Sequence, residues 1–126
     1  MTAPNRNTLW GRAIAAELAH SGVRTVCVSP GSRSTPLTVA VDEHEELTTV
    51  SALDERSAAY FALGRARRTG EAPPLLCTPR TAAANYHPAV VEALQARLPS
   101  LPLSAHRPPQ LRAPGPNPTT DHQQLY

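Results

Sequence analysis

The feature that most constrains this chain is a short apolar run that stops at a turn of small residues and continues into a helix start. Residues 26–36 have the sequence V-C-V-S-P-G-S-R-S-T-P. The β-branched valines predict a buried strand, which ends at the S-P-G turn of residues 29–31. Thr35 is a suitable N-cap and Pro36 a suitable first helical residue, so a helix is expected to begin at once.

The same turn is a candidate anion-binding site. Backbone N–H groups at a helix start favour a carboxylate or phosphate, and Ser32 and Arg33 add a hydroxyl and a guanidinium. The alternative is an ordinary β–α turn with one exposed arginine. Because the Walker and dinucleotide-binding spacings are both absent, spacing alone favours the ordinary turn.

Helical and strand patterns alternate along the first hundred residues. We expect strands at 24–29, 47–53 and 75–78, and helices at 8–20, 36–44, from Asp54 to Gly70, and 82–97 with a disturbance at Pro88. Short apolar strands between helices predict an α/β fold. Its parallel sheet has three or four strands, with strand 24–29 central and helices on both faces.

The last part of the chain has a different composition. Residues 99–118 contain seven of the fourteen prolines. Pro102 lies where the next strand is expected, so this segment is an edge strand or no strand. We therefore divide the chain into an α/β domain, 1–98, and a Pro-rich, divergent end of the same domain, 99–126.

Composition excludes several classes of function. The net charge is +2, all twelve basic residues are arginine, and aromatic residues make up 4% of the chain, so nucleic-acid binding is unsupported. Neither an export signal nor a membrane-spanning stretch is recognisable, which predicts a cytoplasmic protein. Cys27 and Cys77 lie in apolar runs and are expected to be reduced and buried. The five histidines have no metal-ligand spacing.

Four motifs, taken in order, closely resemble one family. They are V-S-P-G-S-R-S-T-P, D-E-R, L-L-C-T-x-x-T-A-A-A-N-Y-x-P-A-V-V-E-A and R-P-P-Q-L-R. The family is 2-succinyl-5-enolpyruvyl-6-hydroxy-3-cyclohexene-1-carboxylate synthase, a thiamine diphosphate enzyme of menaquinone biosynthesis. The resemblance runs from about Thr8 to the end. It corresponds only to the N-terminal, pyrimidine-binding domain of a much longer enzyme, whose fold it implies here.

The resemblance implies a role for Glu55, which alone would be taken for helix-dipole compensation. The matching glutamate is catalytic and hydrogen-bonds the aminopyrimidine ring of the cofactor, where it stabilises the imino tautomer. Further cofactor-binding residues and four substrate-binding residues are implied as well. They are Pro30, Gly31, Thr81 and Asn85 for the cofactor, and Ser32, Arg33, Arg107 and Asn117 for substrate carboxylates.

The family's reaction decarboxylates 2-oxoglutarate and adds the succinyl unit to isochorismate. The resemblance therefore implies a transferase with thiamine diphosphate and Mg²⁺ as cofactors, small carboxylate substrates, and a homodimer or larger assembly. The magnesium ligands of the family are not in this chain. Because parallel strands present their carboxyl ends at one side, we expect Ser32, Arg33 and Glu55 along one rim of the sheet.

Several residues depart from the family pattern. Pro79 and Arg80 stand where the family has Ser-Gly, and Pro118 replaces a glutamine near the substrate. These departures leave a second hypothesis open, that of a catalytically silent fragment or pseudo-enzyme that only folds and associates. A third possibility is a generic anion-binding α/β domain that uses the turn at 29–36.

Overall fold

The computed structural model describes residues 3–106 and residue 126, and it contains one parallel sheet. The strands lie in the order β2-β1-β3-β4, and every neighbouring pair is parallel. Strand β1 thus lies inside the sheet, as predicted for 24–29. The elements are α1 (Arg6–His20), β1 (Thr25–Val28), α2 (Thr35–Asp42), β2 (Thr48–Ser51), α3 (Glu55–Thr69), β3 (Pro74–Cys77), α4 (Thr81–Ala84), α5 (His87–Gln95) and β4 (Leu101–Ser104).

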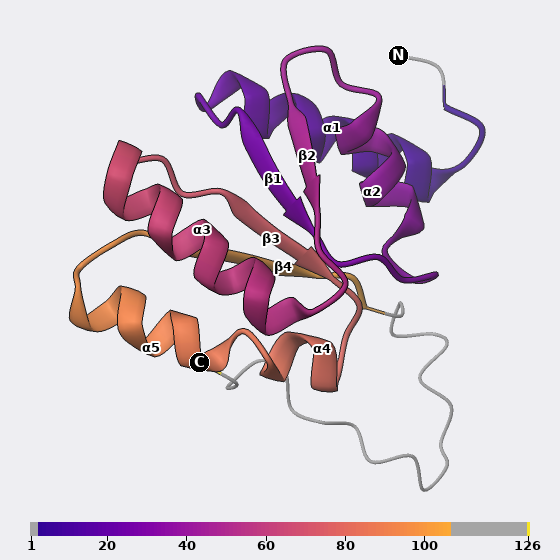
Figure 1. Cartoon of the computed structure of the whole chain (residues 1–126). Helices are drawn as coiled ribbons and strands as arrows, with labels where there is room; N and C mark the ends of the chain where they lie inside the picture. The colour runs from indigo at the N-terminus through magenta and orange to yellow at the C-terminus, as the bar shows by residue number, and fades with distance from the viewer. Residues whose placement is uncertain (1–2, 107–125) are drawn as a thin grey trace, which may run out of the picture.

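Helices cover both faces of the sheet, which confirms the predicted α/β class (Figure 1). Side chains of alternate strand residues point to opposite faces. Val26, Val28 and Leu76 pack against buried residues of α1 and α2, whereas Cys27, Leu75 and Cys77 pack against α3, α4 and α5. Both cysteines are free and buried, as expected.

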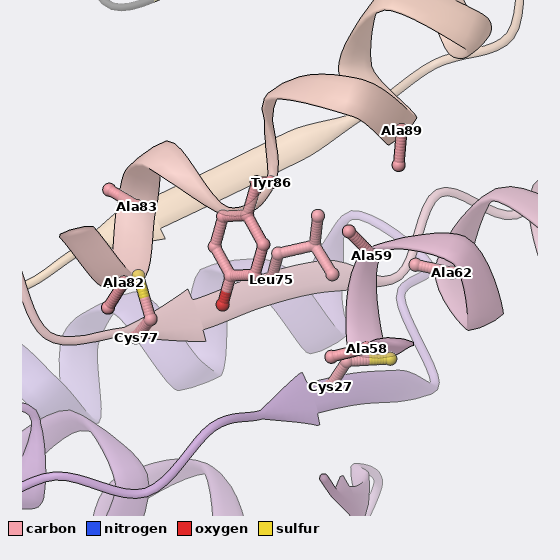
Figure 2. Close-up of a cluster of buried hydrophobic side chains, with 10 residues drawn as sticks. All are labelled: Cys27, Ala58, Ala59, Ala62, Leu75, Cys77, Ala82, Ala83, Tyr86 and Ala89. Carbon is pink, nitrogen blue, oxygen red and sulfur yellow. The ribbon is translucent and has the colours of Figure 1, made fainter. Parts of the chain in front are cut away.

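The helical side of the core consists mostly of alanine. Six buried alanines of α3, α4 and α5 surround one large side chain, Tyr86, the largest that is fully buried (Figure 2). On the other face, α1 approaches α2 closely at Gly11, where a Cβ would lie 2.7 Å from the Pro36 carbonyl oxygen. Small residues therefore replace the aromatic side chains that this composition lacks.

Three local predictions need correction or refinement. The N-cap of α2 is Ser34 rather than Thr35, because the buried Ser34 hydroxyl donates to the Gly31 carbonyl and fixes the turn there. Leu53 lies beyond β2 and is 87% exposed, so the strand predicted at 47–53 ends earlier. The helix predicted at 82–97 is two helices, and Pro88 lies in the first turn of α5, as the disturbance there indicated.

The remaining boundaries follow the sequence signals. The Asp54 side chain caps α3 by accepting from the backbone N–H groups of Arg56 and Ser57, and Gly70 ends the helix with a φ of 77°. Among residues 3–106, strand β4 lies at the edge of the sheet and pairs only with β3, so the edge-strand alternative for Pro102 is confirmed. Within the described residues, no helix has the length and apolar character needed to cross a membrane.

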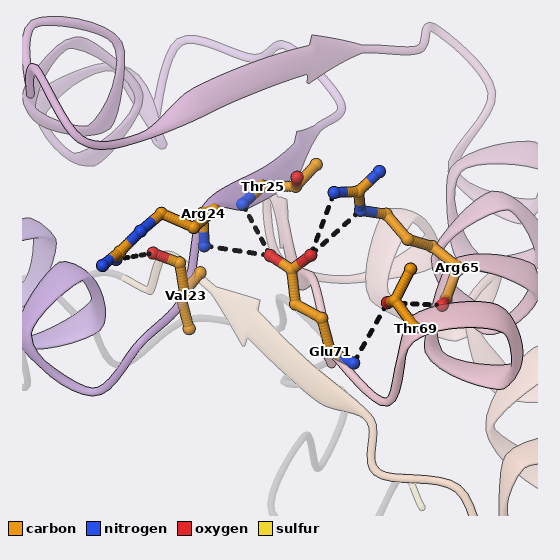
Figure 3. Close-up of polar contacts among 6 residues, drawn as sticks. All are labelled: Val23, Arg24, Thr25, Arg65, Thr69 and Glu71. Atoms are coloured by element: carbon orange, nitrogen blue, oxygen red, sulfur yellow. Dashed lines mark hydrogen bonds and ion pairs between the residues drawn. The ribbon is translucent and has the colours of Figure 1, made fainter.

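Glu71 joins the start of β1 to α3 (Figure 3). Its carboxylate accepts hydrogen bonds from the backbone N–H groups of Arg24 and Thr25, at 2.9 and 2.8 Å, and from the Arg65 guanidinium. Burial raises the pKa of this carboxyl. The hydrogen bonds and the Arg65 charge lower it by more than burial raises it, so the pKa lies below its ordinary value.

Candidate functional site

The carboxyl ends of β1, β2 and β3 lie at the same edge of the sheet. Beyond the strand ends, the Ala52 N–H donates to the Val28 carbonyl at 2.9 Å, and the Ser29 N–H donates to the Leu76 carbonyl at 2.8 Å. These bonds bring the loops after β1, β2 and β3 to one edge (Figure 1). We call this edge, formed by residues 29–34, 52–55 and 78–81, the strand-end rim.

The turn after β1 packs tightly against the loop after β3. A Cβ on Gly31 would come within 2.2 Å of the Thr78 methyl carbon, so only a glycine fits the present arrangement. Ser32 and Arg33 are exposed in this turn. Neither side chain has a hydrogen bond or ion pair within residues 3–106 and 126, so both are available to a ligand.

Glu55 is the first residue of α3 and lies at the same rim, half-buried. Because Asp54 already accepts from the first N–H groups of the helix, they do not engage Glu55. Its carboxylate has no hydrogen bond or ion pair in the part of the chain that the structure describes. A half-buried carboxylate without a partner is poorly solvated, and a hydrogen-bond donor on a ligand would relieve this cost.

The pKa of a neighbouring thiol agrees with a position of Glu55 at the strand-end rim. Burial raises the pKa of the Cys77 thiol, at the end of β3, to about 11, and the Glu55 charge contributes to the increase. Glu55 follows β2 at the carboxyl end of the parallel sheet and is half-buried, so it lies neither at the opposite edge nor inside the core. Its catalytic role stays a prediction, as do the roles of Ser32 and Arg33.

The loop after β3 carries the other candidate cofactor residues. Thr81 and Asn85 are exposed at the two ends of α4, and the Asn85 amide donates to the Thr81 carbonyl at 3.0 Å. Pro30 is exposed and Gly31 half-buried on the facing turn. Arg107 and Asn117, predicted to bind substrate, lie outside the described residues.

Arg80, where the resemblance implies a glycine, has φ 77° and ψ −131°. This backbone conformation is one that glycine adopts readily and residues with a Cβ adopt at a cost. The turn therefore retains a backbone shape suited to glycine, and Arg80 adopts it at an energetic cost.

Two polar residues beneath the rim were not predicted to have any role. Ser29 is 1% exposed and Tyr86 is 0% exposed, and neither hydroxyl has a partner within the described chain. Both residues stand inside the motifs quoted above, Ser29 directly after the strand and Tyr86 after the A-A-A-N run. Only the buried hydroxyls, which a sequence does not reveal, mark them as unusual.

Other parts of the described chain offer weaker candidates. No group of three histidine, cysteine, aspartate or glutamate side chains within residues 3–106 and 126 is arranged to hold a metal ion. Two adjoining hollows of about 310 and 240 Å³ lie between α1 and α2 and share Arg12, Ala40 and Glu43. Neither contains a predicted site residue.

The chain is similar to several known proteins. Relatives from several organisms carry the name 2-succinyl-5-enolpyruvyl-6-hydroxy-3-cyclohexene-1-carboxylate synthase. Those from Haloquadratum walsbyi and Halobacterium salinarum are each 67% identical over all 126 residues, and that from Microcystis aeruginosa is 48% identical over 97% of the chain. The chain spans about a fifth of their length, 20%, 22% and 21% respectively.

A family description matches nearly the whole chain. It is "Thiamine pyrophosphate enzyme, N-terminal TPP binding domain", and the match covers residues 10–125. This range includes all three loops of the strand-end rim and every element of the sheet. The chain therefore belongs to the thiamine pyrophosphate enzyme family and corresponds to its N-terminal domain.

Proposed function

We propose that this chain is the N-terminal, pyrimidine-binding domain of a thiamine diphosphate-dependent transferase of menaquinone biosynthesis. The transferase decarboxylates 2-oxoglutarate and adds the succinyl unit to isochorismate. The name and similarity of the relatives support this reaction. The structural observation that carries the proposal is the half-buried Glu55 carboxylate, which lies at the rim with no hydrogen bond or ion pair to any described residue.

The residues of the rim fit an aminopyrimidine ring. A ring nitrogen and an amino group present a hydrogen-bonding edge, and the Glu55 carboxyl group can exchange a proton with that edge. Pro30, Gly31, Thr81 and Asn85 lie on the facing loops, where they would bound the ring. Thiamine diphosphate supplies, when bound, the nucleophilic carbon that attacks a 2-oxo acid.

Ser32 and Arg33 would bind substrate carboxylates. The planar guanidinium of an arginine matches a carboxylate with two parallel hydrogen bonds, and the start of α2 adds a favourable dipole. Arg107 and Asn117 are proposed to complete this carboxylate site. Both substrates carry carboxylates, which is why a rim with free cationic and hydroxyl groups suits them.

The rest of the cofactor site would come from outside this chain. Since the described residues contain no metal-ligand group, we propose that Mg²⁺ and the diphosphate are held by a part of the protein beyond this chain. We further propose a homodimer or larger assembly in the cytoplasm. Within the chain, residues 1–98 would form the main domain and residues 99–126 its Pro-rich end.

A chimera tests the proposal. This chain replaces the N-terminal fifth of the Haloquadratum walsbyi relative, and the consumption of 2-oxoglutarate in the presence of isochorismate is measured. We expect turnover, and a loss of at least about 100-fold in Glu55→Gln, since the variant cannot exchange the proton. Glu17→Gln, an exposed glutamate of α1, is the matched control and should retain full activity. A folded chimera in which Glu55→Gln is as active as the control would contradict the proposal.

The same assay distinguishes an active transferase domain from a catalytically silent fragment. The unfavourable backbone conformation of Arg80 at the rim is the observation that favours it. A chimera that is inactive with Arg80 and active after Arg80→Gly would support a chain that has lost its catalytic competence at this position.

A further inference from the structure

Three polar groups lie together beneath the strand-end rim in an otherwise apolar part of the core. They are the Ser29 and Tyr86 hydroxyls and the Cys77 thiol, and none of the three residues is more than 1% exposed. Within the described residues, the two hydroxyls have no hydrogen-bond partner. Buried hydroxyls without partners are rare because their desolvation is not compensated, so a partner is expected.

The fold brings these groups together from three elements. Ser29 follows β1, Cys77 ends β3, and Tyr86 lies between α4 and α5. Figure 2 shows the Tyr86 oxygen directed away from Ala89, toward the Cys77 end of β3. This is the end of the strand that meets the rim, so the hydroxyl points toward the site rather than toward the helices.

Glu55 lies within electrostatic reach of this cluster. Burial is the main cause that raises the pKa values of Cys77 and Tyr86. The interactions of Tyr86 with Cys77 and Ser29 come next, and the negative charge of Glu55, which raises both pKa values, is the smallest contribution. The thiol and the phenol are therefore neutral hydrogen-bond donors at pH 7. No cation pairs with the Glu55 carboxylate in the described chain. The first turn of α3, which carries Glu55, leads into Ala58 of the same buried cluster as Tyr86 and Cys77, so these donors lie beneath the Glu55 end of the helix.

We propose that Tyr86 is a positioning residue for Glu55, whose carboxylate it holds at the rim by donating its buried hydroxyl, with Ser29 as the second member of the same hydrogen-bonding group. Because the Tyr86 hydroxyl has no direct partner among the described residues, the bond passes through one internal water, which a cluster of several polar groups can bind. The proposal rests on the proposed function only in assigning Glu55 to the cofactor; the coupling of the side chains does not depend on it.

A purely structural role for Tyr86 makes a different prediction. Its ring packs among alanines of α3 and α4, including Ala58 and Ala83, and thereby supports the first turns of α3. Phenylalanine preserves this packing and removes only the hydroxyl. Tyr86→Phe therefore separates the two roles, and Tyr60→Phe, on the exposed side of α3, is the matched control.

The test is a double-mutant cycle on the 126-residue chain, read by urea unfolding at pH 7. The variants are Tyr86→Phe, Glu55→Ala and the two together, beside the same cycle with Tyr60→Phe. We expect the effects of Tyr86→Phe and Glu55→Ala on the unfolding equilibrium constant to depart from simple multiplication by about threefold or more. The control pair should multiply to within about twofold.

The outcomes are distinct from those of the cofactor experiments, because the cycle contains no cofactor. Effects of Tyr86→Phe and Glu55→Ala that multiply like the control pair overturn the proposal, even if Glu55 proves essential for turnover in the chimera. If Tyr86→Phe does not fold, the cycle of Ser29→Ala with Glu55→Ala decides by the same criterion. Coupling in either cycle supports the proposal even if the chimera has no activity.

Discussion

Gly31 and Thr78 hold two loops of the strand-end rim in contact: a Cβ on residue 31 would lie 2.2 Å from the Thr78 methyl carbon. The first residue belongs to the turn after β1 and the second to the loop after β3, so one glycine sets the spacing between two neighbouring loops. The same turn carries Ser32 and Arg33, whose positions relative to the loop after β3 therefore depend on this contact.

Gly31→Ala should destabilise the chain by about 1–3 kcal/mol, the usual cost of forcing a methyl group into a packed position. Urea unfolding measures the change. Thr78→Ser removes the obstructing methyl group and keeps the hydroxyl, so the double variant Gly31→Ala/Thr78→Ser should recover most of the loss. Gly64→Ala, on α3 with no neighbour within 4 Å, is the control and should be neutral or stabilising. A Gly31→Ala variant as stable as this control would show that the loops separate freely.

Arg80→Gly should stabilise the chain by about 1 kcal/mol, because glycine relieves the unfavourable φ of 77° at that position. Thermal unfolding is a suitable measurement. Arg80→Ala shortens the side chain but retains the Cβ, so it should show no comparable gain. Equal stabilisation by both substitutions would mean that the arginine side chain, and not the backbone conformation, is the cause.

The sequence predicts the sheet well because the signals for its elements are local. The valines of 26–28, the Asp54 cap and the break near Pro88 each depend on neighbours within a few residues, and the structure confirms all three. The parallel order follows from the alternation of strands and helices. The edge position of β4 follows from the proline in that strand.

The site was harder to predict because its features depend on contacts between distant segments. The buried hydroxyl of Tyr86 is 57 positions from Ser29 along the chain, and nothing local marks either hydroxyl as unpaired. The N-cap of α2 was placed one residue late, since the sequence does not show that the Ser34 hydroxyl turns back to Gly31. Similarly, Leu53 matched the strand pattern although its side chain extends into solvent.

Glu71 should make stability depend on acidity. Burial raises and hydrogen bonds lower the pKa of this carboxyl, with a net decrease in the folded state. A group with a lowered folded pKa adds stability above its unfolded pKa of about 4.3, and this contribution is lost as the pH falls through the folded pKa. We expect Glu71→Gln to lower the free energy of unfolding at pH 7 by about 1–3 kcal/mol and to reduce its fall in acid.

Unfolding in urea at several pH values between 7 and 3 measures this dependence. Glu46→Gln is the control at pH 7, because the Glu46–Arg24 ion pair is exposed and should contribute less than about 1 kcal/mol. If Glu71→Gln has the same stability at pH 7 and the same loss in acid as the unaltered chain, the carboxylate does not stabilise the start of β1.

The 126-residue chain alone should bind thiamine diphosphate only weakly. Magnesium in proteins is usually held by carboxylates together with the phosphates of the ligand, and no group of three histidine, cysteine, aspartate or glutamate side chains among the described residues is arranged to hold it. The proposed contact through Glu55 would be worth at most about 3 kcal/mol as a charge-assisted hydrogen bond, whereas lost freedom on association costs about 4 kcal/mol or more. Titration calorimetry with cofactor and Mg²⁺ should therefore detect no binding in the micromolar range, and Glu55→Gln should not differ measurably. Low-micromolar binding by the chain alone, abolished in Glu55→Gln, would mean that the strand-end rim is a sufficient cofactor site without the rest of the protein.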